Sequence, residues 1–156
     1  MADALILETM SPELREVAER ARREPGARFH SLAHLIDEAA LQRAYRRQRS
    51  EAAVGVDGVT KEQYGQELEA NVRDLHERMR TMRYRHQPIL RRYIAKEGGK
   101  KKRPIGISAF EDKIVQDAIR EVLQAVYEQW FLDCSYGSRP GRRAHDALRA
   151  LDQVAH

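Results

Sequence analysis

Apolar residues recur at intervals of three and four along most of this 156-residue chain, which is the pattern of helices that bury one face. Glycine, proline and polar segments separate the stripes. The stripes predict helices that begin at Ser11, Ser31, Thr60, Glu111 and Ala144. Proline directly after Ser11, and glutamine three residues after Thr60, are typical signals of a helix start. The pattern therefore predicts a mainly helical chain.

The helix that begins at Glu111 has the widest apolar stripe. Its members are Ile114, Val115, Ala118, Ile119, Val122, Leu123 and Val126. Glu111 and Asp112 suit the positive N-terminal end of a helix, so we interpret them as surface acids that favour the helix dipole. Apolar surface at Val122, Val126 and Leu148 is expected to stay partly without a partner. Such a surface favours self-association or a C-terminal partner chain.

Residues 93–107 follow a different pattern, in which two short runs flank the pair Gly98-Gly99. A glycine pair supplies the positive φ that a tight turn requires, so the segment predicts a β-hairpin over Tyr93–Ile107. One helix later comes a loop, Ser135–Arg143, that is rich in glycine and arginine. Both segments are expected to hold cationic side chains around a polyphosphate or a nucleic-acid backbone.

Positive charge is concentrated in the hairpin and in the segment before it. Between Arg78 and Arg103 there are eleven lysines and arginines and one acid, Glu97, whereas the net charge of the whole chain is only +4. A concentrated patch is the electrostatic signature of a polyanion partner, because neutralised phosphates release counterions. A solvated charged face is the alternative for any such stretch. The concentration in one hairpin favours nucleic acid.

Composition excludes several other classes of protein. Aromatic residues make up 6% of the chain and charged residues 33%, so the core must be aliphatic. No apolar run is long enough to cross a bilayer, and the first residues lack the basic start and the long apolar stretch of a secretion signal. The single cysteine, Cys134, cannot form an internal disulfide. We expect a cytoplasmic protein with no membrane partner.

Four motifs follow one another in a characteristic order. They are Gly55–Thr60, the hairpin Tyr93–Ile107, Asp112–Gln116 and Ser135–Arg142. Their order and spacing resemble the N-terminal part of the group II intron-encoded reverse transcriptases, the intron maturases, over roughly Ser31 to His156. One motif alone is weak evidence of relationship, whereas four in sequence indicate common descent.

The resemblance implies an α+β, mainly helical fold that forms the fingers and a partial palm of a right-hand polymerase, with a basic β-hairpin. Residues 1–30 are expected to be an N-terminal helical extension. Residues 31–156 are expected to be the reverse transcriptase fingers and the start of the palm. The helix from Asp112 and the loop at Tyr136 would then lie ahead of the first catalytic strand.

The resemblance also implies roles for individual residues. Lys96 and Arg103 are expected to contact the triphosphate of the incoming nucleotide, where fixed cations stabilise developing negative charge. Contacts to template or primer phosphates are expected from Arg91, Arg92, Lys100, Lys101, Lys102, Arg139, Arg142 and Arg143. We interpret Asp57 and Gln116 as structural, a turn-forming side chain and a buried amide. The chain departs from the family at Ser138, where an aromatic residue is common.

Nucleotidyl transfer of this type needs two metal ions held by carboxylates, and the family's Tyr-x-Asp-Asp motif does not occur in the sequence. We therefore expect a fragment of an RNA-directed DNA polymerase that is truncated before these carboxylates and catalytically incomplete alone. No catalytic residue, metal ligand or cofactor is predicted in this chain, and Mg²⁺ is expected for the complete polymerase. The expected partners are intron or template RNA, an RNA/DNA duplex and, in the complete enzyme, a deoxynucleoside triphosphate.

Two alternatives remain open. The chain could be a non-enzymatic RNA-binding module that uses the same basic surface, or a helical domain whose charges only keep it soluble. The salt dependence of RNA binding separates the second alternative from the others. Protection of Lys96 and Arg103 by a nucleotide separates the first alternative from a polymerase fragment.

Overall fold

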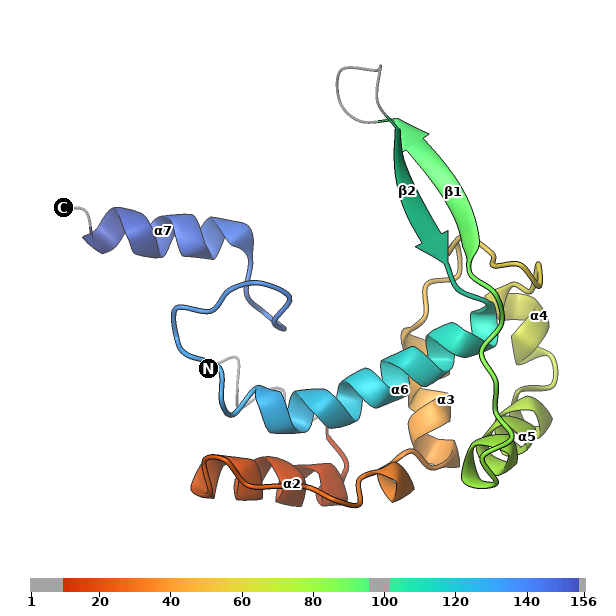
Figure 1. The fold of residues 1–156 in the computed structure, drawn as a ribbon, viewed down its shortest axis with the longest axis horizontal. Coiled ribbons are helices and arrows are strands. Elements are labelled where there is room, and N and C mark those ends of the chain that lie inside the picture. The colour runs from red at the N-terminus through yellow and green to blue at the C-terminus, as the bar shows by residue number, and fades with distance from the viewer. Residues whose placement is uncertain (1–9, 96–101, 155–156) are drawn as a thin grey trace. The chain divides into compact units, whose positions relative to one another are not determined.

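A computed structural model describes residues 10–95 and 102–154 (Figure 1). In chain order its elements are α2 (Pro12–Arg23), a 3₁₀ turn (Ala33–Leu35), α3 (Glu38–Arg47), α4 (Lys61–Gly65), α5 (Leu68–Arg80), β1 (Leu90–Ala95), β2 (Lys102–Ile107), α6 (Phe110–Tyr127) and α7 (Ala144–Val154). The two strands pair in one antiparallel sheet. The predicted α+β, mainly helical class is confirmed.

The chain divides into two compact units. One comprises Met1–Leu32 with Glu121–His156, and the other comprises Ala33–Arg120. The functional division expected from the sequence, into residues 1–30 and 31–156, stays a prediction.

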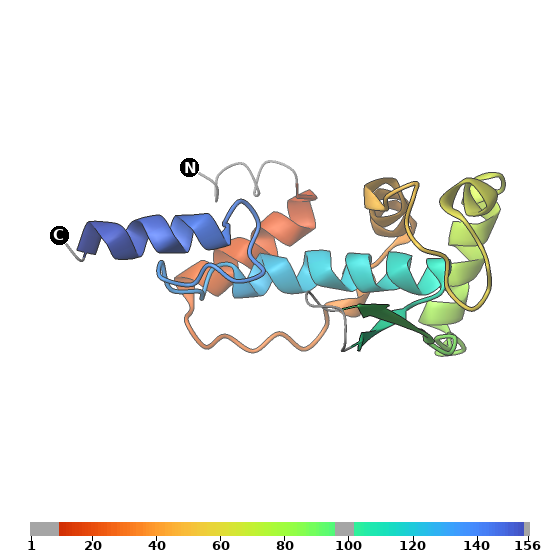
Figure 2. The same cartoon turned by 90° about the horizontal axis from the view of Figure 1, so that it is seen from above.

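The unit Ala33–Arg120 is built on a small core shared by α3, α4, α5 and the first half of α6. The buried core residues are Leu41, Ala44, Tyr64, Val72, Leu75, Phe110, Ile114, Val115 and Ala118. The rings of Tyr45, Tyr64 and Phe110 pack together with centroids 5.4–6.2 Å apart. The hairpin β1–β2 projects away from these helices (Figures 1 and 2).

Helix starts were predicted well where a capping side chain is well defined. The Ser11 hydroxyl accepts from the Leu14 amide at 3.4 Å, with Pro12 at the first helical position. Thr60 and Gln63 form a reciprocal capping box at the start of α4. Both observations match the pattern of polar side chains that satisfy the first backbone amides of a helix.

Two details of the predicted helices are wrong. Ser31 does not cap a helix, because the carboxylate of Asp37 caps α3 instead and accepts from the Ala40 amide at 2.7 Å. The stripe that follows Thr60 is also divided between two helices, α4 and α5. A Cβ atom at Gly65 would lie 2.1 Å from the Tyr45 hydroxyl. The Tyr45 hydroxyl therefore lies directly against Gly65, the last residue of α4, and a larger residue there would displace the tyrosine.

The hairpin was predicted, and its first strand begins at Leu90, three residues before Tyr93. The predicted turn at Gly98-Gly99 lies outside the described residues. Helix α6 begins at Phe110 and ends at Tyr127, so that Trp130 and Phe131 lie beyond it.

In the unit that contains α2 and α7, Trp130 donates from its indole nitrogen to the Ala21 carbonyl at 2.9 Å. Val122 and Val126 are buried, each with 5% of its surface exposed, whereas Leu148 is exposed. The expectation of a partly unpaired surface is therefore wrong for the two valines. It holds for Leu148, because α7 buries none of its residues.

Within the residues that the structure describes, no helix is both long and apolar enough to cross a membrane.

Candidate nucleic-acid interface

The register of the hairpin sorts its cations onto two faces. The paired residues are Leu90 and Ile107, Arg91 and Gly106, Arg92 and Ile105, Tyr93 and Pro104, Ile94 and Arg103, and Ala95 and Lys102. Directly paired residues share a face, and successive residues of a strand point to opposite faces. Arg92 and Arg103 therefore lie on one face. Arg91 and Lys102 lie on the other.

All four of these cations are exposed. None of them forms an ion pair within residues 10–95 and 102–154, so their charges are available to a ligand. The remaining predicted hairpin cations, Lys96, Lys100 and Lys101, lie outside the described residues. The structure thus brings part of the predicted phosphate-binding set together on one hairpin, but it places Arg103 on a different face from Lys102.

The segment that leads into β1 is attached to the first turn of α6 by Asp112. This carboxylate is 4% exposed. One of its oxygens accepts from the Tyr84 hydroxyl, and the other accepts from the Gln87 amide at 3.0 Å. Burial, together with the Asp112 carboxylate, raises the pKa of Tyr84. Asp112 therefore holds the chain three residues before the hairpin begins.

Glu111 is engaged in a neighbouring network. It accepts from Arg78 at 2.7 Å and from the Tyr64 hydroxyl at 3.4 Å, while Arg78 also donates to Asp74 at 2.6 Å. Burial raises the pKa of Tyr64, and Glu111 adds to the effect. Both acids lie in the first turn of α6, as the helix-dipole interpretation expects. Their interpretation as surface acids is wrong, because Asp112 is buried and both acids bond to distant segments.

These contacts reduce the basic patch that the sequence shows. Arg78 is paired with Asp74 and Glu111, and Arg80 is paired with Glu77 at 3.0 Å. The start of the cationic run therefore belongs to the internal charge balance of α5. The described hairpin cations, in contrast, keep their charges available to a partner.

The Gly55–Thr60 motif contacts the segment between β2 and α6. Asp57 accepts from the Val59 amide at 3.4 Å and from the Phe110 amide at 3.3 Å, so one carboxylate shapes its own turn and caps α6. A Cβ atom on Gly55 would lie 2.5 Å from the Ser108 carbonyl oxygen, directly after β2. The structural interpretation of Asp57 agrees with these contacts. Gln116 also bonds structurally, to Ser108 at 3.1 Å, but it is exposed and not buried.

The Gly- and Arg-rich loop uses its arginines differently. Arg139 is buried, and its guanidinium donates to Glu128 at 2.6 and 2.9 Å. The same group donates to the carbonyls of Leu132 and Ser135, both at 3.0 Å. The side chains of Arg139 and Glu128 are only 3% and 5% exposed. Arg139, which the resemblance implies is a template contact, therefore points into the protein and ties the loop to the end of α6.

The other two loop arginines lie nearer the surface. Arg142 is half-buried, lies 5.4 Å from the ring centroid of Tyr136 and donates to the Asp133 carbonyl. Arg143 is exposed. The chain reverses here with Ser138 and Gly141 at φ values of 57° and 68°. Ser138 thus adopts a left-handed conformation, at the position where the resemblance implies an aromatic residue.

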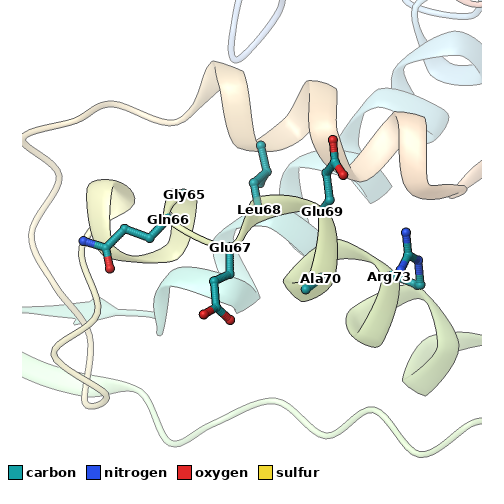
Figure 3. A pocket seen from close by; sticks show the side chains of 7 residues that line it. All are labelled: Gly65, Gln66, Glu67, Leu68, Glu69, Ala70 and Arg73. Atoms are coloured by element: carbon teal, nitrogen blue, oxygen red, sulfur yellow. The ribbon is translucent and has the colours of Figure 1, made fainter.

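A hollow of about 550 Å³ lies where α4 meets α5. Figure 3 shows that the side chains around it, among them Gln66, Glu67, Leu68 and Arg73, point in different directions and do not converge on one point. The hollow therefore offers no concerted set of polar groups for a ligand. In the part of the chain that the structure describes, no cluster of three His, Cys, Asp or Glu side chains could hold a metal ion.

Comparison with known proteins connects this basic hairpin protein to intron-encoded proteins. The chain is 41% identical over 83 residues to the group II intron-encoded protein LtrA of Lactococcus lactis subsp. cremoris, which covers 53% of this chain and 14% of that protein. It is 33% identical over 141 residues to protein YkfC of Escherichia coli, covering 88% of this chain and 37% of YkfC. It is 43% identical over 42 residues to nuclear intron maturase 2, mitochondrial, of Arabidopsis thaliana, covering 27% of this chain and 6% of the maturase. No protein-family model matches.

These similarities agree with the order of motifs along the chain. The chain is homologous to a part of the group II intron-encoded proteins and intron maturases. It spans 14% of the length of the Lactococcus protein. The activity, substrates and partners of the whole proteins are therefore only proposals for this chain.

Proposed function

We propose that this chain is the fingers and the start of the palm of a group II intron reverse transcriptase, and that it binds template RNA and the incoming nucleotide. The proposal is supported by the homology to intron-encoded proteins and by the hairpin. The observation that carries it is the hairpin's set of exposed cations, Arg91, Arg92, Lys102 and Arg103, on strands whose entry is fixed by buried Asp112.

Binding a phosphate orders the cationic side chain that contacts it, and this ordering costs free energy. A cation on a flexible loop loses conformational entropy when it binds a phosphate, whereas a cation on a paired strand is already partly ordered. Asp112 accepts from the Gln87 amide, three residues before β1, and Asp57 accepts from the Phe110 amide, three residues after β2, so the chain is held close to each end of the hairpin. Fixed cations are also the groups that best stabilise the charge of a departing pyrophosphate. This supports the role proposed for Arg103 with Lys96.

The proposed RNA surface does not include Arg139. Its guanidinium is fully engaged with Glu128 and with the two loop carbonyls, so we assign it to the loop's internal structure. In the unit that contains the loop, Arg143 remains a proposed RNA contact of its own because it is exposed, and Arg142 remains as a weaker one. Mg²⁺ and a polymerase activity belong, in this proposal, to a complete enzyme with a Tyr-x-Asp-Asp motif. The chain alone should incorporate no nucleotide.

The test is the binding of fluorescent RNA by the 156-residue chain, followed by anisotropy across a salt series. Each lost phosphate contact reduces the slope of log affinity against log salt by about 0.7 to 0.9. Replacing Arg91, Arg92, Lys102 and Arg103 by glutamine should therefore reduce the slope by roughly 3 and weaken binding at low salt.

A matched control removes the same charge elsewhere. Glutamine at Arg22, Arg23, Arg28 and Arg49 lowers the net charge equally, and all four of these side chains are exposed. The control should keep most of the slope. Equal losses in both variants would show that net charge, and not the hairpin, attracts RNA. Absence of RNA binding by the unmodified chain at low salt would reject the proposed function.

A further inference from the structure

The two faces of the hairpin differ in more than their cations. On one face, Tyr93 lies opposite Pro104, with Arg91 two residues before it and Lys102 paired at the next position on that face. Proline has no amide hydrogen, so this pair occupies a non-hydrogen-bonded position of the ladder, where facing side chains lie closest. The side chains of Tyr93 and Pro104 are therefore close neighbours on this face.

The same face continues toward the base of the hairpin as an apolar surface. A Cβ atom on Gly106 would lie 2.8 Å from a methyl carbon of Ile89, so the Ile89 side chain covers the glycine. Ile89 is 61% exposed and Tyr93 is 59% exposed. Tyr93 thus faces solvent between the two cations, and Ile89 faces solvent at the base, on the other side of Arg91. Among the described residues, no third strand pairs with this hairpin.

The opposite face has no aromatic group among its described residues. It carries Ile94 and Ile105, which are 36% and 39% exposed, between Arg92 and Arg103. Branched aliphatic side chains offer no planar surface to a nucleobase. The two faces therefore present similar charge and different shapes, one suited to a planar ring and one not.

We propose that the Tyr93 face binds an unpaired RNA nucleotide, with its base stacked on Tyr93 and its neighbouring phosphates held by Arg91 and Lys102. This inference rests on the proposed function and specifies the form of RNA that the hairpin selects. A tyrosine ring can stack on any nucleobase that is free of a duplex, and a basic groove beside it follows the backbone. Bases inside a helix are already stacked on both sides. The Tyr93 face should thus favour a single strand over a duplex.

The experiment compares a single-stranded RNA with a blunt duplex of the same length, with the 156-residue chain and its Tyr93→Ala and Tyr93→Phe variants. Tyr93→Ala should weaken single-strand binding at least fivefold, the lower limit for one lost base stack. Duplex affinity should change less than twofold. Tyr93→Phe should retain single-strand binding because it keeps the ring. The salt slope should be the same for all three proteins, since no charge is removed.

Ile94→Ala is the matched control on the opposite face, and a thermal melt of each variant shows that the fold is retained. The proposal fails if Tyr93→Ala weakens duplex and single strand equally, if Tyr93→Phe loses as much as Tyr93→Ala, or if Ile94→Ala has the same effect. Each of those results leaves the proposed function standing, provided that the unmodified chain binds RNA with a steep salt slope. Absence of any RNA binding by the unmodified chain overturns both.

Discussion

The hairpin and the loop Ser135–Arg143 are both rich in cations, but the fold uses their charges in different ways. The hairpin exposes Arg91, Arg92, Lys102 and Arg103 and leaves them without ion pairs in the described residues. The loop places Arg139 inside the protein against Glu128. An arginine in a basic motif is therefore not by itself a ligand contact. The fold can use it as a structural cation that satisfies backbone carbonyls.

This difference has a physical cause. A two-stranded hairpin satisfies its backbone through the ladder, and both of its faces are free to carry side chains outward. The irregular loop has carbonyls without such partners, and a guanidinium with five donors can satisfy several of them at once. Arg139 does so at Leu132 and Ser135.

The largest expected effect follows from breaking the buried pair in the loop. Arg139→Met leaves Glu128 charged and buried without its partner, which should lower the free energy of unfolding by about 3–5 kcal/mol. Trp130, the only tryptophan, lies between Glu128 and the loop and reports urea unfolding by its fluorescence. Adding Glu128→Gln should recover part of the loss. Arg143→Met is the control and should cost little.

The structural role of Arg139 would be contradicted if Arg139→Met proved as stable as the unmodified chain and lost RNA affinity. Arg139 would then be a nucleic-acid contact, as the resemblance implies, and the loop would resemble the hairpin in its use of charge.

The second effect tests the attachment of the hairpin. Asp112→Asn keeps the size of the side chain but weakens its bonds to Tyr84 and Gln87, which should cost about 1–3 kcal/mol of stability. Hydrogen exchange of the Gln87 amide should become faster. The variant also removes one negative charge and so raises the net charge by one unit. This change of charge alone would tighten RNA binding. Loss of the anchor should instead weaken it, because the hairpin cations become less ordered.

Asp74→Asn makes the same change of charge at an exposed carboxylate and serves as the control. Tighter RNA binding in both variants would show that Asp112 has no part in positioning the hairpin.

A third effect is the loss of stability at alkaline pH, and it concerns Tyr64 in the unit that contains the hairpin. The pKa of Tyr64 is raised by burial and by Glu111, so the folded chain holds this proton more tightly than the unfolded chain does. The resulting stability is complete below the ordinary tyrosine pKa of about 10 and is lost as pH rises above it, by up to about 1.4 kcal/mol per pH unit. Urea unfolding between pH 9 and 11 should therefore depend less on pH in Tyr64→Phe. An unchanged dependence would contradict the raised pKa.

The sequence predicted the parts of this fold that depend on local signals. Capping by Ser11 and Thr60, the apolar stripe of α6 and the hairpin all follow from short-range patterns. The division between α4 and α5 was not predicted, because apolar residues recur at helical spacing through both helices. The close approach of Tyr45 to Gly65, twenty residues later, is likewise not visible in short-range patterns.

The candidate site shows the same limit. Charge concentration predicted the basic patch, and the resemblance implied which hairpin cations bind phosphate, whereas neither predicted the roles of Asp112 and Arg139. Their partners, Gln87 for the first and Glu128 for the second, lie 25 and 11 residues away in the sequence. The signal that could have pointed to Asp112 is its position one helical turn before Val115, a buried member of the apolar stripe of α6. A charged residue next to a buried position is often paired.

The smallest expected effect separates the two surface arginines of the loop. Arg143→Gln removes an exposed charge and should reduce the RNA salt slope by up to about 0.7 to 0.9, the value for one phosphate contact. Arg142→Gln should reduce it less, because Arg142 is half-buried over Tyr136 and already donates to the Asp133 carbonyl. Salt titrations of the two variants, with Arg22→Gln as the control, measure the difference. A larger loss of slope for Arg142 than for Arg143 would mean that contacts inside the loop do not withdraw an arginine from RNA. The contrast between hairpin and loop would then reduce to Arg139 alone.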